Sequence, residues 1–151
     1  MDKQVDMEFV RSEYFHLQKT VEDFDQRALG IKGWSVTVSM AGLVAAFTEK
    51  EPLILLLAAA SAIMFWIIEA YWKRFQLAYF FRIRQIEAYM KGDDVGTFTT
   101  PHITGSWGIG YSQYSILNIM WWTQVYLPHL VIAIAGFLLW IINLFLPIIK
   151  P

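Results

Sequence analysis

The chain of 151 residues contains no cysteine. This absence excludes disulfide bonds, thiolate nucleophiles and metal sites with sulfur ligands. Histidine is scarce, and no two of the three histidines have the His-x-x-x-His spacing of a helical metal site. The chain also lacks a Gly-x-Ser-x-Gly motif and a Gly-Lys-Ser/Thr phosphate loop. We therefore expect neither an enzyme nor a bound metal or other cofactor.

Charge is limited and nearly balanced, because charged residues make up 17% of the chain and the net charge is −1. A chain of this charge has no general attraction for nucleic acid. Hydrophobic residues, in contrast, make up 56% of the chain, which exceeds the usual share in a soluble domain. This excess predicts an all-α integral membrane protein that forms one domain over residues 1–151, with the lipid bilayer as its first partner.

Glycine and proline are both absent from the 39 residues between Pro52 and Gly92. Such flanking residues are typical of the two ends of a helix, so we expect one helix over Leu53–Lys91. Residues 53–72 are largely apolar and contain one acidic or basic residue, Glu69, and about 20 apolar residues match the thickness of a bilayer core. From Lys73 the charges return with helical periodicity. The sequence thus predicts a second membrane span, 53–72, that continues as an aqueous helix, 73–91.

A first span is predicted over residues 31–48, joined to the second by the tight turn at Glu49–Pro52. One face of this span carries only small residues, at spacings of four, three and four: Ser35, Ser39, Gly42 and Ala46. Small faces allow membrane helices to pack closely, and their hydroxyls can also line a narrow polar path. Both interpretations, a helix-packing face and a pore wall, remain open.

The segment 1–29 is predicted to be a separate amphipathic helix that ends at Gly30. Its apolar residues follow a strict heptad register: Met7, Val10, Tyr14, Leu17, Val21, Phe24 and Ala28. Such a seam packs against another helix. The partner is either the aqueous helix 73–91 of the same chain, in an antiparallel hairpin, or a second copy of the chain. In the hairpin, acidic residues near Asp25 approach Lys73.

Basic residues predict the orientation in the membrane, because they accumulate on the cytoplasmic side. Five precede the first span and five follow the second, whereas the turn and the C-terminal tail carry one each. The N-terminus and the aqueous hairpin are therefore expected in the cytoplasm. The basic residues nearest to the membrane form a patch that we expect to contact anionic lipid: Lys73, Arg74, Arg82 and Arg84.

The C-terminal third is less regular. Residues 92–111 contain five glycines and four threonines and are predicted to be a loop, with a short hairpin around 97–104 as the alternative. Residues 112–124 are aromatic-rich and predict an interfacial helix that leads into a third span, 125–146. If 112–127 also crosses the membrane, there are four spans.

One acidic residue and one histidine lie inside apolar spans, and such residues are candidates for function by default. Glu69 is in the second span and His129 is in the third. A local pair between Glu69 and Lys73 would give Glu69 a purely structural role. An ion- or proton-linked role requires Glu69 and His129 to face each other or a pore.

The layout resembles the small multi-pass bacterial inner-membrane proteins that assemble into homo-oligomers, some of which are effectors of anti-phage systems. The resemblance includes the runs Lys32–Thr37 (KGWSVT) and Phe81–Glu87 (FRIRQIE). It implies an oligomeric inner-membrane protein that forms a channel or perturbs the membrane. The alternative is a non-conducting anchor or scaffold whose cytoplasmic helices bind a partner protein.

Overall fold

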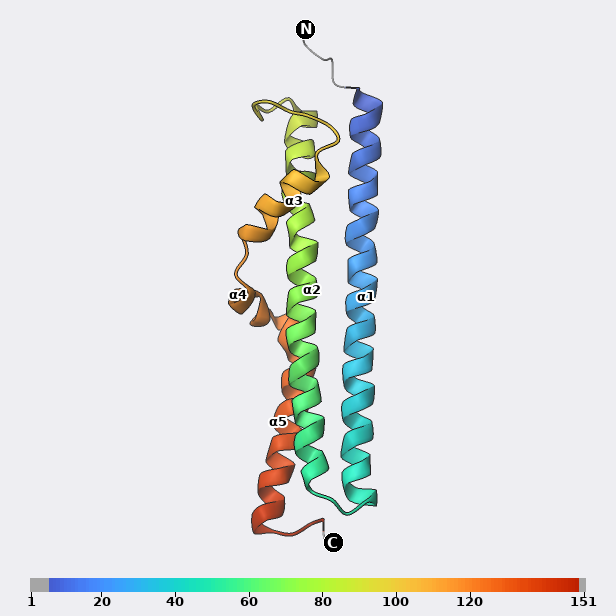
Figure 1. The fold of residues 1–151 in the computed structure, drawn as a ribbon, viewed down its shortest axis with the longest axis vertical. Coiled ribbons are helices and arrows are strands. Elements are labelled where there is room, and N and C mark those ends of the chain that lie inside the picture. Colours follow the sequence, from blue (N-terminus) through green and yellow to red (C-terminus); the bar gives the residue numbers. More distant parts are fainter. Residues whose placement is uncertain (1–5, 150–151) are drawn as a thin grey trace.

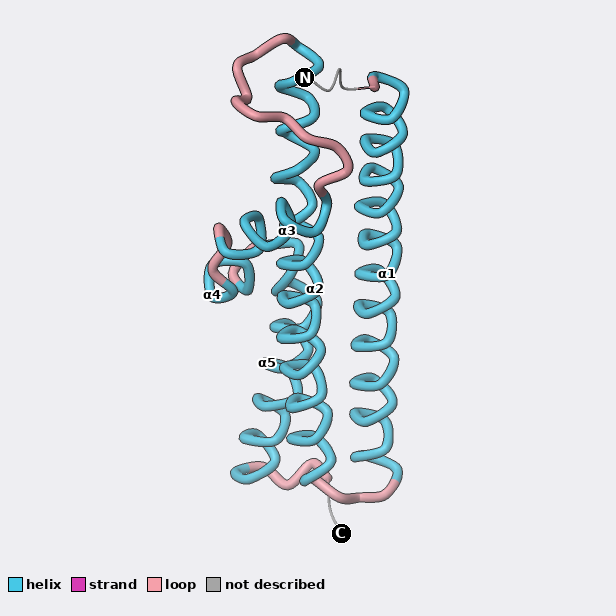
Figure 2. Tube along the Cα trace, turned by 45° about the horizontal axis from the view of Figure 1, so that its top comes forward, coloured by secondary structure: helices cyan, strands magenta, loops and turns pink. Residues whose placement is uncertain are grey.

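A computed structural model describes residues 6–149, which form five helices (Figure 1). The long helices α1 (Met7–Thr48) and α2 (Leu53–Lys91) lie side by side and antiparallel. The third long helix, α5 (Thr123–Phe145), packs against the first half of α2. Two short helices, α3 (Ile103–Ser112) and α4 (Ile116–Met120), lie along the remainder of α2 (Figures 1 and 2).

The predicted all-α membrane fold is confirmed. No strand occurs in residues 6–149, and three of their helices, α1, α2 and α5, are long and apolar enough to span a membrane. The alternative of a fourth span over 112–127 is wrong, because this region forms only the five-residue helix α4 and the start of α5. Pro128 lies inside α5 without ending it, as expected where neighbouring helices surround the freed backbone groups.

The long helix α2 has the predicted bounds. It begins after Pro52, and Gly92 ends it in the left-handed conformation, with φ of 84°. Glycine adopts this conformation without steric cost, and its N–H bonds back to the carbonyls of Ala88 and Tyr89. The α2 helix contacts every other helix and is the centre of the fold.

Helix α1 corrects one prediction: segments 1–29 and 31–48 are not separate helices, because α1 continues through Gly30 and Gly33. A helical glycine costs about 1 kcal/mol relative to alanine. Burial of side chains on both sides of these glycines offsets that cost, since Ala28 and Ser35 are both buried. Tertiary contacts thus outweigh the local breaking signal. The first five residues of the predicted helix 1–29 lie outside the described part of the chain.

The glycine-rich segment corrects another prediction. Residues 103–111, predicted as loop, belong to α3, and the hairpin around 97–104 is absent from this described region. Glycine here serves close packing, because a Cβ on Gly110 would overlap the carbonyl oxygen of Ala78 on α2. The predicted interfacial helix 112–124 is reduced to α4, and α5 begins two residues before the predicted start of the third span.

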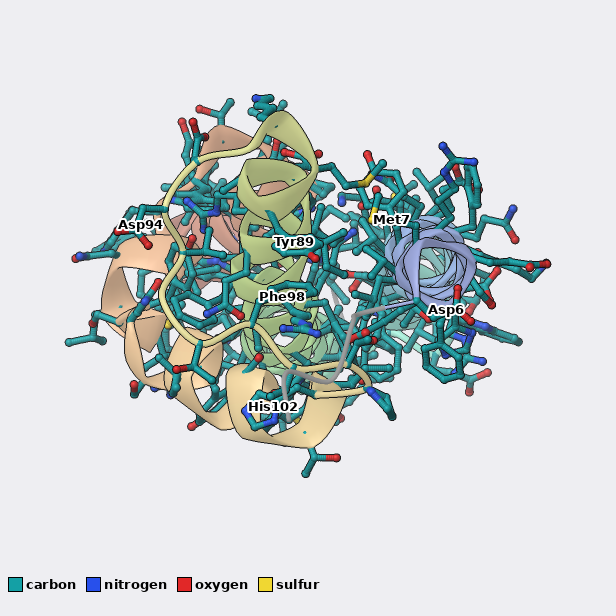
Figure 3. All side chains as sticks on the ribbon, turned by 90° about the horizontal axis from the view of Figure 1, so that it is seen from above. Asp6, Met7, Tyr89, Asp94, Phe98 and His102 are labelled. Carbon is teal, nitrogen blue, oxygen red and sulfur yellow. The ribbon has the colours of Figure 1, made fainter. Side chains whose placement is uncertain are left out.

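The heptad seam of α1 faces α2, as the hairpin alternative requires. Val10, Leu17 and Val21 form one core with Ile83 and Ile86 of α2. The remaining seam residues differ in burial: Ala28 is buried, Tyr14 and Phe24 are half-buried, and Met7 is 42% exposed. Figure 3 views the bundle from the end where α1 begins and α2 ends. The loop 92–102 passes the end of α2 here, and Phe98 lies beside Tyr89, on the side away from Met7. The rings of Phe98 and Tyr89 stack at 4.0 Å.

Candidate functional site

Glu69 of α2 is the centre of a buried polar network. Its side chain is 2% exposed and forms an ion pair with Lys32 of α1 through one carboxylate oxygen. The other oxygen lies 2.8 Å from Nε2 of His129 on α5. The structural alternative, a pair between Glu69 and Lys73, does not form, because Lys73 pairs instead with Asp25 of α1 at 3.2 Å.

His129 extends the network to the first helix. It is fully buried, and its Nδ1 lies 2.7 Å from the hydroxyl oxygen of Ser35. A neutral imidazole with the proton on Nε2 donates to Glu69 and accepts from Ser35, whereas an imidazolium donates to both. Lys32, Glu69, His129 and Ser35 therefore join all three spanning helices through groups that can exchange protons.

The small-residue face of α1 is buried inside the bundle. Below Ser35, the hydroxyl oxygens of Ser39 and Ser61 lie 3.1 Å apart. Further along, Gly42 approaches Ala58 so closely that an added Cβ would lie 3.0 Å from the Ala58 Cβ. Ala46 is also fully buried. This face thus packs within one protomer, against α5 at Ser35 and against α2 at Ser39 and Gly42, and its polar part ends at Ser39 and Ser61.

A cavity of about 260 Å³ lies beside the ion pair, at the aqueous end of the spanning segments. This volume is large enough for several water molecules. Its lining combines two basic and two acidic side chains with neutral ones: Asp25, Ala28, Leu29, Lys32, Glu69, Lys73 and Gln124. The cavity thus provides space for water beside the buried network.

A second buried ion pair lies in the aqueous hairpin and was not expected from the sequence. Arg82 of α2 donates two hydrogen bonds to Glu13 of α1, at 2.8 and 3.1 Å. Glu13 also accepts from the Thr100 hydroxyl and the His102 backbone N–H, and Arg82 donates to the Thr99 carbonyl at 2.7 Å. The pair therefore fastens the loop 92–102 to both long helices.

Two opposing effects act on the pKa of Glu13. Burial raises the pKa, whereas hydrogen bonds from Arg82 and Thr100 and the charge of Arg82 lower it. The lowering effects together exceed the effect of burial, so the pKa lies below its ordinary value of 4.5. Glu13 also stands three residues before His16 with Glu-x-x-His spacing, which is found in some metal sites. The side chains do not converge, because Glu13 faces the core and His16 is exposed.

The four basic residues of the predicted patch have different partners. Lys73 pairs with Asp25, and Arg82 is buried with Glu13. Arg84 donates to the Tyr114 hydroxyl at 2.8 Å, and the Arg74 guanidinium lies 3.9 Å from the centre of the Tyr111 ring. Only Arg74 and Arg84 of these four have no carboxylate partner among residues 6–149.

Within residues 6–149 there is no group of three or more histidine and acidic side chains that could hold a metal ion. Comparisons with protein-family models, curated proteins and solved structures give no significant match. The functional argument therefore depends on the chemistry of the described residues.

Proposed function

We propose that the protein is an oligomeric inner-membrane protein of bacteria that makes the membrane permeable to ions, with its N-terminus in the cytoplasm. The observation that supports this most strongly is the buried network of Lys32, Glu69 and His129. Ionisable groups inside a membrane bundle are costly and are commonly part of ion or proton paths. We further propose that this activity serves in defence against phage, as that of an anti-phage effector.

The polar groups support a path through the half of the bundle nearer to the aqueous hairpin. The path begins at the cavity beside Lys32 and Glu69, passes Ser35, and reaches Ser39 and Ser61. Beyond these serines the helices pack through small apolar residues, which leave no polar group to continue the path. Gly42 of α1 lies against Ala58 of α2, and Gly136 of α5 lies against Leu55 and Ala59 of α2. We interpret this arrangement as a closed state, which conducts only after the apolar half opens.

Ion flux into liposomes that contain the purified full-length protein tests this proposal. We expect flux with the wild type and a strong loss with Glu69→Gln, which keeps the side-chain shape but removes the charge. Glu51→Gln is the matched control, because Glu51 is exposed in the turn between α1 and α2. Absence of flux from correctly inserted wild-type protein, at every membrane voltage applied, would contradict the proposal.

A non-conducting anchor or scaffold is the second candidate, and a specific observation favours it. The serine face that could line a pore between copies is instead buried within one protomer, because Ser35 and Ser39 are both fully buried. The aqueous halves of α1 and α2 then serve as a rigid hairpin for a partner protein. Overexpression distinguishes the candidates, since a channel depolarises cells and an anchor leaves the membrane potential unchanged.

A further inference from the structure

Two buried hydrogen-bond donors on neighbouring helices have no acceptor. They are Nε of Arg74 on α2 and Nε1 of Trp107 on α3, and neither finds a partner among residues 6–149. Buried N–H groups are almost always paired, since leaving one unpaired is costly. Two such donors in one cluster indicate an acceptor that comes from outside the chain.

The two donors belong to one stack of side chains. Three rings contact one another: Tyr111 lies 5.1 Å from Trp107 and 5.8 Å from Phe75, and Phe75 lies 6.1 Å from Trp107. The guanidinium of Arg74 lies over the same Tyr111 ring at 3.9 Å. A cation held on a ring in this way is oriented, yet its charge is not neutralised by a carboxylate.

The position of the stack relative to the membrane suggests the missing acceptor. Arg74 is the second residue after Trp72, where the predicted span ends. This level is the headgroup region, which is rich in phosphate oxygens and in which tryptophan and tyrosine are enriched. Arginine is well suited to phosphate, because its planar guanidinium donates several hydrogen bonds in a fixed geometry.

We infer that Arg74 and Trp107 bind a phosphate group at the membrane surface, on a shelf formed by Phe75 and Tyr111. The phosphate is that of a phospholipid headgroup or a soluble phosphate that reaches the same level. Both donor side chains are only half-buried, so a small rotation presents either N–H to the phosphate. This binding site is independent of the proposed ion permeation.

Native mass spectrometry of the full chain in detergent tests the inference with phosphatidylglycerol. Trp107→Phe keeps the ring and removes the N–H, and Arg74→Lys keeps the charge and removes Nε. Each lost hydrogen bond to a charged group should weaken binding about tenfold. The matched controls are Trp34→Phe, at an exposed tryptophan, and Arg27→Lys, at an exposed arginine whose Cζ lies 5.9 Å from the Trp72 ring centroid. Neither should change binding by more than about twofold.

Two further arms identify the source of the phosphate. A galactolipid without phosphate should not bind, and inorganic phosphate is added as a competitor and titrated by calorimetry. Binding of phosphatidylglycerol that phosphate does not displace assigns the site to lipid, whereas displacement at millimolar concentration assigns it to a soluble phosphate. The inference is overturned if Trp107→Phe, with a native circular dichroism spectrum, binds both ligands like the wild type, or if the galactolipid binds equally well.

Discussion

Replacement of Glu13 by glutamine should destabilise the contact between α1 and α2 in the aqueous hairpin. The side chains of Glu13 and Arg82 are only 2% and 3% exposed, and two hydrogen bonds join them. The variant leaves the guanidinium buried with only neutral partners, such as the Thr99 carbonyl. Removal of one partner of a buried ion pair costs about 3–5 kcal/mol. The exposed Glu22 of the same helix provides the control, and Glu22→Gln should change stability by less than about 0.5 kcal/mol.

Hydrogen exchange measured by mass spectrometry locates this loss of stability. A cost of 3–5 kcal/mol corresponds to exchange that is faster by roughly two to four powers of ten in segments that open with the pair. We expect this increase in residues 7–21 and 92–102, which the pair joins, and little change in α5. The double variant Glu13→Leu with Arg82→Met removes both charges and should restore most of the protection, because an apolar pair leaves no charge unpaired.

Two results would refute this reasoning. Equal protection in Glu13→Gln and Glu22→Gln would mean that the ion pair does not hold the hairpin together. A double variant as unstable as the single one would mean that the cost comes from the lost contacts with the loop, such as that to Thr100, and not from an unpaired charge.

Three further predictions concern pH and packing. Because the pKa of Glu13 is lowered in the folded protein, the stabilisation that it contributes is complete above its ordinary pKa of about 4.5 and is lost as the pH falls below that value. The protection of residues 92–102, measured relative to the intrinsic exchange rate at each pH, should therefore fall in acid, and much less so in Glu13→Gln. Gly42→Leu should separate α1 from α2 and destabilise the bundle by about 1–3 kcal/mol in a thermal unfolding assay, because its Cβ already reaches Ala58. Gly110→Ala should release α3 from α2 and increase its exchange, whereas Gly108→Ala, which meets open space, should be neutral or stabilising by up to about 1 kcal/mol; equal exchange of α3 in these two variants would contradict the packing argument.

The long elements could be predicted from the sequence because their signals extend over many residues. The run between Pro52 and Gly92 has no helix breaker, and α2 has those bounds. The heptad pattern likewise predicted a helix with an apolar face, and this face packs against α2. Local signals were less reliable: Gly30 does not end α1, and glycines in 103–111 allow α3 to pack closely on α2. A glycine that breaks a helix and one that permits close packing look alike in a sequence.

The candidate site was only partly visible in the sequence. Glu69 and His129 were identified because an ionisable residue is conspicuous in an apolar span, and they lie in hydrogen-bond contact. Lys32 was missed, since it stands at the start of a span where a basic residue is common. The pair of Glu13 and Arg82 was missed for a different reason, because each residue lies in a segment with many charges and only the folded chain shows which of these are buried.

The two ion-pair networks bear on how the proposed polar path could open. Movement of α1 away from α2 breaks both the pair of Lys32 with Glu69 and the pair of Glu13 with Arg82. Movement of α5 breaks its apolar packing, but the only side-chain hydrogen bonds that it loses to the other described helices are those of His129, to Glu69 and to Ser35. From these polar contacts, we expect the antiparallel pair of α1 and α2 to separate less readily than α5. Because α5 also carries the Gly136 contact that closes the apolar half, its displacement would open the path at both levels.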